Sequence, residues 1–260
     1  MSDARLFRLG YSTITWGPTP DLHEALGAIA DAGWEGVEFI SATPDWLGTP
    51  KRLRGLLDQY GLEPSCMLGS VSIAEDKEMV LERQKRLIEY AAEIGSGLYA
   101  FIGAPRVPLR LPTDEEFKQL ADVSEALIDH AAPYDITVVY HAHPRCTVES
   151  EAEQDQLLSY TDRLQICLDV SVSGLMREDP IAQIHKYRDR LAYLHMKDLG
   201  LSKFCVMGEG TGELDFGLIR ETLNEVGYSG WVTGELSSYA DTPAVESCYA
   251  NMAHLKSVGY

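Results

Sequence analysis

Eight short apolar segments alternate with helical patterns along this 260-residue chain, and that alternation limits the possible folds more than any other feature. Several segments are almost continuously apolar, such as Ile-Thr-Val-Val-Tyr at residues 136–140, which is typical of parallel strands buried on both faces. The predicted strands are residues 7–16, 36–40, 64–71, 98–104, 136–143, 164–170, 191–197 and 231–236.

The segments between the strands carry amphipathic patterns and helix-boundary signals. The clearest helices are predicted at residues 21–32, 76–94, 113–132, 215–226 and 242–258. Gly33 is a typical helix stop, and Thr113 with Glu116 matches a capping box. Eight strand–helix units without a linker predict a single (β/α)8 TIM barrel domain over residues 1–260. An open doubly wound sheet is the alternative, but residues 9–14 (LGYSTI) lack its dinucleotide fingerprint.

The chain is strongly acidic, since 40 Asp and Glu residues against 22 Lys and Arg residues give a net charge of −18. Proteins that bind nucleic acid need a basic surface to replace phosphate counterions, so nucleic acid and anionic membranes are disfavoured as partners. The five cysteines form no CxxC pair, which indicates reduced thiols instead of disulfides or a zinc ribbon. No apolar signal segment and no apolar run of 18 residues are found, so we expect a cytoplasmic protein.

Polar residues occur where several predicted strands end, and in a TIM barrel these ends form the active site. They are Trp16, Glu38, His141, His143, Asp169, His195, Lys197 and Glu235. One such residue more often caps a loop than performs chemistry, but four successive strands ending in His, Asp, His and Glu favour a functional site. His141 and His143 are two residues apart, as are His195 and Lys197, so both members of each pair could point into the barrel.

Two imidazoles and two carboxylates form a set that a divalent metal ion accepts. Mn²⁺, Co²⁺, Mg²⁺ and Zn²⁺ are all compatible with it. The remaining histidines fall in helical segments, and we interpret them as surface or packing residues: His23, His130, His185 and His254.

Several stretches of the chain carry a family resemblance. Residues 208–216 (GEGTGELDF) and 227–235 (GYSGWVTGE) together are the more specific signature. The weaker stretches are GWEGVE at 33–38, YHAHP at 140–144, LD at 168–169 and HMKD at 195–198. Over most of its length the chain resembles the xylose isomerase-like TIM barrels of the sugar phosphate isomerase/epimerase and endonuclease IV superfamily.

The resemblance implies one metal site with a ligand from each of strands 5 to 8. By position these ligands are His141, Asp169, His195 and Glu235. We expect one divalent metal ion, with Mn²⁺ favoured. At two positions the chain departs from the family pattern, and both departures narrow the range of expected activities. His141 stands where many members have the Glu that completes the acid/base pair of keto-sugar epimerases, and Val172 stands where an Asp-x-x-His motif has the His that multi-metal endonucleases need. The chain looks more like inosose dehydratase and related keto-sugar lyases.

We therefore expect removal of the proton next to a ketone, followed by loss of a β-hydroxyl or β-alkoxy group from a keto-sugar or keto-cyclitol. Glu235 or His143 is the expected base, and His143 or Lys197 assists the leaving group. Lys197 has an alternative role as an ion-pair partner of Glu235 or Asp198.

Four further residues are expected to bind substrate. Trp16 and Tyr11 stack on a sugar ring or, alternatively, only pack, while Glu38 binds a hydroxyl or caps a loop. Arg145 follows strand 5 and could meet an anionic group, as could Arg106 and Arg110 after strand 4. The glycine-rich turn at 208–213 contains two glutamates and no basic residue, which disfavours a phosphorylated substrate.

Three other interpretations stay open. A sugar isomerase or epimerase would share the proton abstraction but return the proton to carbon. A metal- or sugar-binding barrel without turnover would serve as a subunit of a larger assembly, and the chain itself could form a homo-oligomer or a heteromeric complex. An endonuclease would require a surface of charge −18 to bind DNA.

Overall fold

The eight predicted strands lie side by side, all parallel, and close into a barrel. The computed structural model describes residues 6–40, 44–201, 203–237 and 240–260, and its strand order is β1-β10-β7-β6-β5-β4-β3-β2. The barrel strands are β1 Arg8–Ser12, β2 Gly36–Ile40, β3 Glu63–Val71, β4 Leu98–Gly103, β5 Thr137–His141, β6 Gln165–Asp169, β7 Leu191–Met196 and β10 Trp231–Gly234. The predicted TIM barrel is confirmed.

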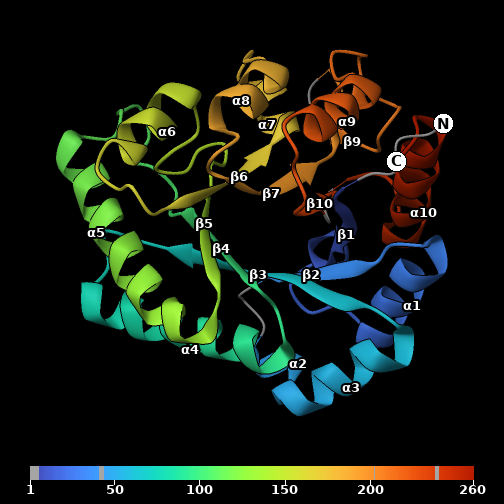
Figure 1. Cartoon of the computed structure of the whole chain (residues 1–260), viewed down its shortest axis with the longest axis horizontal. Coiled ribbons are helices and arrows are strands. Elements are labelled where there is room, and N and C mark those ends of the chain that lie inside the picture. The colour runs from blue at the N-terminus through green and yellow to red at the C-terminus, as the bar shows by residue number, and fades with distance from the viewer. Residues whose placement is uncertain (1–5, 41–43, 202, 238–239) are drawn as a thin grey trace.

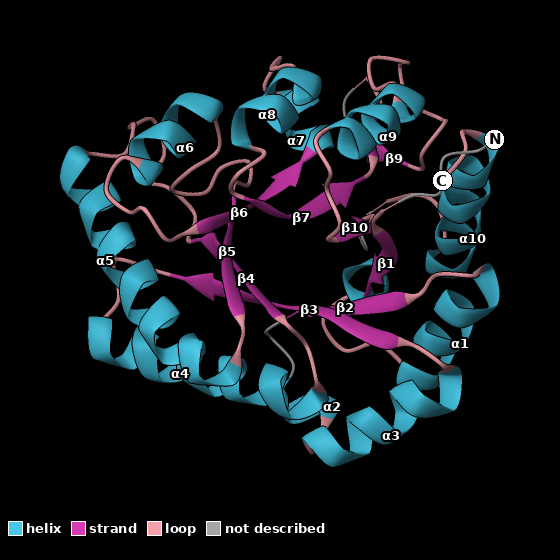
Figure 2. Ribbon diagram, viewed as in Figure 1, coloured by secondary structure: helices cyan, strands magenta, loops and turns pink. Residues whose placement is uncertain are grey.

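Helices surround the barrel and cover its outer face (Figures 1 and 2). They are α1 Leu22–Ala32, α2 Pro44–Leu47, α3 Pro50–Tyr60, α4 Lys77–Ile94, α5 Asp114–Ala131, α6 Glu151–Leu158, α7 Val170–Leu175, α8 Pro180–Tyr187, α9 Phe216–Glu225 and α10 Ala244–Ser257. Short 3-10 helices occur at Thr13–Trp16 and Ala132–Tyr134, and β8 Asp198–Leu199 pairs antiparallel with β9 Phe204–Cys205. No helix in these ranges is long and apolar enough to cross a membrane.

Helix boundaries follow the local signals in the sequence. Gly33 ends α1 in the left-handed region at φ 95°, where a residue without a Cβ is favoured. Thr113 and Glu116 form both halves of the capping box that begins α5. The five helices predicted from these patterns are confirmed to within two residues at each end.

Several strands end earlier than predicted, and each end has a local cause. The Ser12 side chain accepts a hydrogen bond from the amide of Ile14, so the chain leaves β1 and turns into a 3-10 helix. The Asp169 carboxylate caps the first turn of α7, so β6 ends at Asp169 and the helix begins at the next residue. His143 therefore lies in the loop after β5, and Glu235 lies just beyond β10.

The core has two parts, which the alternation of side chains along each strand separates. A large cluster packs between the strands and the helices, and a smaller one fills the inside of the barrel. The inner cluster consists of Cys66, Leu68, Ala100, Val139, Cys167 and Tyr193. Val139, Cys167 and Tyr193 each precede a candidate site residue by two positions, so the inner cluster is the floor beneath the site.

The five cysteines are free thiols in the structure, and four of them are buried.

Close packing between β2 and its neighbours gives a stability prediction. A Cβ on Gly36 would lie 2.5 Å from the Trp231 ring and 2.9 Å from the backbone oxygen of Glu63. We expect Gly36→Ala to lower the free energy of unfolding, measured by chemical denaturation, by about 1–3 kcal/mol. Gly55→Ala in α3 is the control, because its Cβ would meet nothing within 4 Å, and alanine should raise stability there by up to ~1 kcal/mol. Equal stabilities of the two variants would contradict the prediction.

Candidate metal centre and active site

Four buried side chains converge at the carboxyl ends of the strands, directly above the inner cluster. His141 ends β5, Asp169 ends β6, His195 lies in β7 and Glu235 follows β10. One potential ligand atom from each residue lies within 4.8 Å of the others. In the strand register Asp169 stands beside His195, so the fold itself brings these four side chains together.

The orientation of His195 depends on Glu38, from the opposite side of the barrel. Glu38 Oε2 lies 2.7 Å from His195 Nε2, and both side chains are fully buried. This contact turns His195 Nδ1 toward Glu235 Oε2, at 3.7 Å. A carboxylate on the far nitrogen of a histidine is the usual support for a metal-binding imidazole, because it fixes the tautomer and the ring orientation.

Two buried imidazole nitrogens in the site make no hydrogen bond among the described residues. His141 Nδ1 and His195 Nδ1 are buried and accept or donate no hydrogen bond within the described ranges. The two rings lie edge to face with centroids 4.7 Å apart. Buried polar atoms are rarely unpaired in native proteins, so two in one cluster call for a ligand. Together with two carboxylates they fit a divalent metal ion.

The carboxylates are held by different partners. Asp169 Oδ1 accepts from the Ser171 amide at 2.9 Å, from the Ser171 hydroxyl at 2.6 Å and from the Val172 amide at 3.2 Å. Its other oxygen, Oδ2, accepts from the ammonium group of Lys197, which also donates to Glu235 Oε1. Lys197 thus forms the ion pair with Glu235 that was one of its expected roles, and a second one with Asp169.

Burial and charge set the protonation of the site. Burial alone would lower the pKa of His195, but the carboxylates of Glu38 and Glu235 raise it to about 9. Burial and the neighbouring His195 hold the pKa of His141 well below its usual range. Burial alone would raise the pKa values of Asp169 and Glu235, but the Lys197 ammonium outweighs it and lowers both. His141 and both carboxylates are therefore in the state that a metal ion requires at neutral pH, and His195 releases a proton on ligation.

Cys167 is the other potential ligand, since it forms a cluster with His141 and His195. Burial, together with the charge of Glu38, raises the pKa of the Cys167 thiol well above its usual value. A thiol ligand binds metal as the thiolate. The set with two carboxylates is therefore the better fit.

His143 lies at the edge of the site and is half-buried. Its Nδ1 lies 3.1 Å from the Pro144 carbonyl oxygen, which only a protonated Nδ1 can contact favourably. Its ring centroid is 5.6 Å from that of His141. Burial and the positive charge of Lys197 lower the pKa of His143. The contact with the Pro144 carbonyl favours the neutral tautomer with the proton on Nδ1 and the lone pair on Nε2.

Two of the residues expected to bind substrate have other roles. Tyr11 is completely buried, packs against Trp34 with ring centroids 4.8 Å apart, and accepts a hydrogen bond from Asn251. It is a packing residue and does not present its face to a ligand. Glu38 was expected to bind a hydroxyl or cap a loop, but it is buried against His195 and orients that ring.

Trp16 and Arg145 stay predictions as substrate-binding residues. Trp16 is half-buried, and its indole N–H lacks a hydrogen-bond partner among the residues that the structure describes. Arg145 is exposed on the loop after β5, at a positive φ of 65°.

The glycine-rich turn at 208–213 is organised by Asp198. Asp198 Oδ2 accepts from the amides of Gly208 at 2.8 Å and Gly210 at 3.2 Å. These N–H groups are the kind that bind phosphate in other barrels, and here a carboxylate of the same chain already uses them. Asp198 is therefore not the partner of Lys197.

The arginines that could meet an anion are also engaged. Arg106 forms ion pairs with Glu149 and Glu153, and Arg110 pairs with Glu116. Both arrangements agree with the expectation of a substrate without phosphate.

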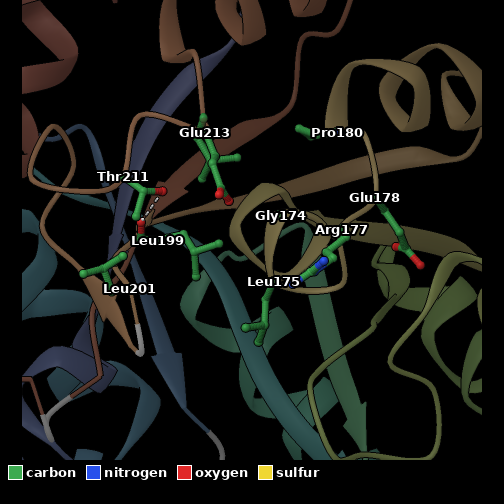
Figure 3. Close-up of a pocket in the computed structure, with 11 residues that line it drawn as sticks. Gly174, Leu175, Arg177, Glu178, Pro180, Leu199, Leu201, Thr211 and Glu213 are labelled. Atoms are coloured by element: carbon green, nitrogen blue, oxygen red, sulfur yellow. Dashed lines mark hydrogen bonds between the residues drawn. The ribbon is translucent and has the colours of Figure 1, made fainter.

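A cavity of about 620 Å³ lies between the segments that follow β6 and β7. Figure 3 shows Leu175 and Arg177 on one side and Leu199 and Glu213 on the other. Helix α7 connects it to the site, because α7 is capped by Asp169 and its last residue, Leu175, lines the cavity.

Sequence reasoning missed three contributions to the site. These are the support of His195 by Glu38, the hydrogen bond from Ser171 to Asp169, and the anchoring of the glycine-rich turn by Asp198. Only the second has a local signal, since an Asp at the point where a strand meets a helix is a typical N-cap whose carboxylate accepts hydrogen bonds from the first turn.

Comparison with known proteins gives a consistent result. Residues 26–258 match the family described as xylose isomerase-like TIM barrel. An inosose dehydratase of Lacticaseibacillus casei is 31% identical over 142 residues, and the match spans 47% of this chain and 48% of that relative, about half its length. An inosose dehydratase of Geobacillus kaustophilus strain HTA426 is 27% identical, over 95% of this chain and 92% of the relative.

Solved structures share the same fold. An L-ribulose 3-epimerase superposes with a TM-score of 0.82 at 17% identity, over 97% of this chain and 95% of that one. The IolI protein with a bound zinc atom superposes with a TM-score of 0.80 at 19% identity, over 97% and 98% of the two chains. At such identities the likeness establishes the architecture alone.

The contact between Glu38 and His195 gives a prediction for metal affinity. Glu38→Gln removes the charge that orients and polarises His195, so we expect the dissociation constant for Mn²⁺, measured by calorimetry, to rise about 10–100-fold. Glu63→Gln is the control, because Glu63 is an exposed partner of Arg54 at the start of β3. An unchanged affinity in Glu38→Gln would show that the pair does not support a ligand.

The same pair predicts a pH dependence for the metal-free protein. The pKa of His195 is raised from about 6.5 to about 9, so its interaction with Glu38 and Glu235 stabilises the folded state fully below pH ~6.5. This contribution is lost as the pH rises through about 9. We expect chemical denaturation to show wild-type stability falling between these pH values, with a smaller fall in Glu38→Gln. Parallel curves for the two proteins would contradict the assignment.

Proposed function

Because the chain belongs to the xylose isomerase-like TIM barrel family, whose pattern it matches over residues 26–258, we propose that it is a metal-dependent lyase or dehydratase of non-phosphorylated keto-sugars or keto-cyclitols. One observation carries the proposal. Two unpaired imidazole nitrogens face two ionised carboxylates, and a neutral histidine stands at the edge of the same site.

The proposed metal ligands are His141, Asp169, His195 and Glu235. A divalent ion held there would act as a Lewis acid that stabilises the negative charge developing on a ketone oxygen. Mn²⁺ is our favoured ion. The zinc atom of the structurally similar IolI protein supports a divalent ion without deciding which one.

His143 is the better of the two expected bases. Its lowered pKa keeps it neutral, and because Nδ1–H faces the Pro144 carbonyl, Nε2 has the lone pair that accepts a proton. Glu235 is less suited, because the pKa of this carboxyl is lowered and one of its oxygens already accepts from Lys197. We propose that His143 Nε2 removes the proton next to the ketone.

Lys197 is proposed to assist the leaving group. The carboxylates of Asp169 and Glu235 raise its pKa against the effect of burial, so it stays a charged ammonium group that can donate a hydrogen bond to the departing oxygen. In the reaction the electrons of the broken C–H bond form a C=C bond, the C–O bond to the β-oxygen breaks, and that oxygen takes a proton. The products are an enone and water, or an enone and an alcohol when the β-group is an alkoxy group.

A small neutral substrate agrees with the surroundings of the site. The amides of the glycine-rich turn and two nearby arginines are occupied by carboxylates of the chain, which leaves little for a phosphate. Trp16 offers an indole N–H toward which a hydroxyl could bind. Two relatives named inosose dehydratase support a cyclitol or sugar ketone.

The isomerase or epimerase alternative has less support. Its acid/base pair of two glutamates, implied by the family resemblance, needs a carboxylate at the position of His141. Here that position presents an unpaired imidazole nitrogen. A barrel that binds metal or sugar without turnover is the remaining alternative, and the experiment below separates all three.

The test is to incubate Mn²⁺-loaded protein with inosose and with a 3-keto-glucoside, and to follow enone absorbance and product mass. Loss of water or of the aglycone supports the lyase. Conserved mass with an altered sugar would replace it with an isomerase or epimerase, and no conversion would favour a binding barrel. Absence of any bound metal by elemental analysis would overturn the site assignment.

A matched pair of histidine variants tests the proposed base. His143→Gln should lower turnover about 100-fold or more while the protein keeps its metal. His130→Gln is the control, because His130 lies in α5 and contacts Glu89 on the outer surface. Full activity of His143→Gln would transfer the role of base to Glu235.

A further inference from the structure

A lysine ammonium group lies inside the proposed metal site. Lys197 is almost fully buried, and its Nζ donates to Asp169 Oδ2 and to Glu235 Oε1. The same Nζ lies 4.7 Å from the centre of the Phe204 ring. A buried ammonium group is costly unless charged or polar partners surround it, and two of these partners are proposed metal ligands.

The oxygen atoms are not equally available to a metal ion. Asp169 Oδ1 already accepts three hydrogen bonds from Ser171 and Val172, so Oδ2 is the oxygen left for ligation, and Lys197 occupies it. Glu235 is different, because Oε1 accepts from Lys197 while Oε2 faces His195 Nδ1 at 3.7 Å. A divalent ion and Lys197 therefore compete at Asp169 but not at Glu235.

The net charge of the site also indicates that Lys197 and a divalent ion compete. Glu38, Asp169 and Glu235 contribute −3, and Lys197 contributes +1, so the buried cluster carries −3 + 1 = −2 when both imidazoles are neutral. A divalent ion would bring this sum to zero. Replacing Lys197 by a neutral residue would leave −3 and remove a nearby positive charge that repels the incoming ion.

We propose that Lys197 is the resident counter-cation of the site, and that it gives up Asp169 Oδ2 when a divalent ion binds while it keeps Glu235. This inference rests on the metal-binding part of the proposed function. The Phe204 ring stays in contact with the ammonium group after the hydrogen bond to Asp169 breaks. This contact lowers the free-energy cost of the exchange. The N–H that is freed can then donate to the departing oxygen of a substrate. Binding of the metal ion therefore also makes Lys197 available to the substrate.

The test measures Mn²⁺ affinity by competition with a fluorescent chelator. Lys197→Met and Lys197→Gln should both bind Mn²⁺ about tenfold or more tightly than the wild type, because the competing positive charge is gone. Lys197→Arg keeps the charge and should bind no more tightly than the wild type. Lys186→Met is the matched control, since Lys186 also bridges two carboxylates, Glu151 and Asp155 at 2.6 Å each, but on the outer surface.

Thermal unfolding with and without Mn²⁺ gives a second measurement. The neutral variants should melt lower than the wild type without metal, and Mn²⁺ should raise their melting temperatures by more than it raises that of the wild type. If Lys197→Met does not fold without metal, Lys197→Gln serves, because its amide still donates to one carboxylate. If both variants fold only when Mn²⁺ is present, this also supports the proposal, because the stabilisation by Mn²⁺ is then larger than in the wild type.

The outcomes distinguish this inference from the proposed function. If the wild type binds no divalent ion, the metal-dependent function fails. If the wild type binds Mn²⁺ and the neutral variants bind it equally or more weakly, only the role of Lys197 as a displaced counter-cation is overturned.

Discussion

The two-residue repeat of the β-strand fixes both the core and the site of this barrel. Every second side chain of a strand points inward, so a strand that buries Val139 also turns His141 inward, and the same holds for Cys167 with Asp169 and for Tyr193 with His195. The apolar residues fill the interior, and the polar residues sit one step closer to the open end. A slip of one residue in any of these strands would turn a site residue outward toward the helices.

The site concentrates charge where burial makes charge expensive. Glu38, Asp169, Glu235 and Lys197 are all buried, and each has a partner of opposite charge or a hydrogen-bond donor. Such a cluster contributes little to net stability, because desolvation offsets most of the attraction between its members. The surrounding packing therefore has to keep these charged side chains in place. Removal of one of these charged side chains would leave a buried charge on its partners without the opposite charge or hydrogen bond that offsets it.

Much of this arrangement can be predicted from the sequence, and the remainder cannot for a physical reason. Apolar runs and capping residues reveal the strands and helices, and strand ends with His, Asp, His and Glu reveal the four potential metal ligands that the fold brings together. The support of His195 by Glu38 joins residues 157 positions apart across the barrel, and a register shift between Val37 and Glu38 helps aim the side chain. The burial of Tyr11 likewise depends on Trp34 and Asn251, whose positions only the closed barrel defines.

Asp198 provides the glycine-rich turn with an internal anion. A Cβ on Gly210 would lie 2.1 Å from this carboxylate, so the chain closes around Asp198 as tightly as it would around a bound ligand. An external anion would therefore have to displace the Asp198 carboxylate to reach the amides of Gly208 and Gly210. Without the Asp198 carboxylate, the amides of Gly208 and Gly210 would lose their acceptor, so this single side chain decides whether the turn is already filled.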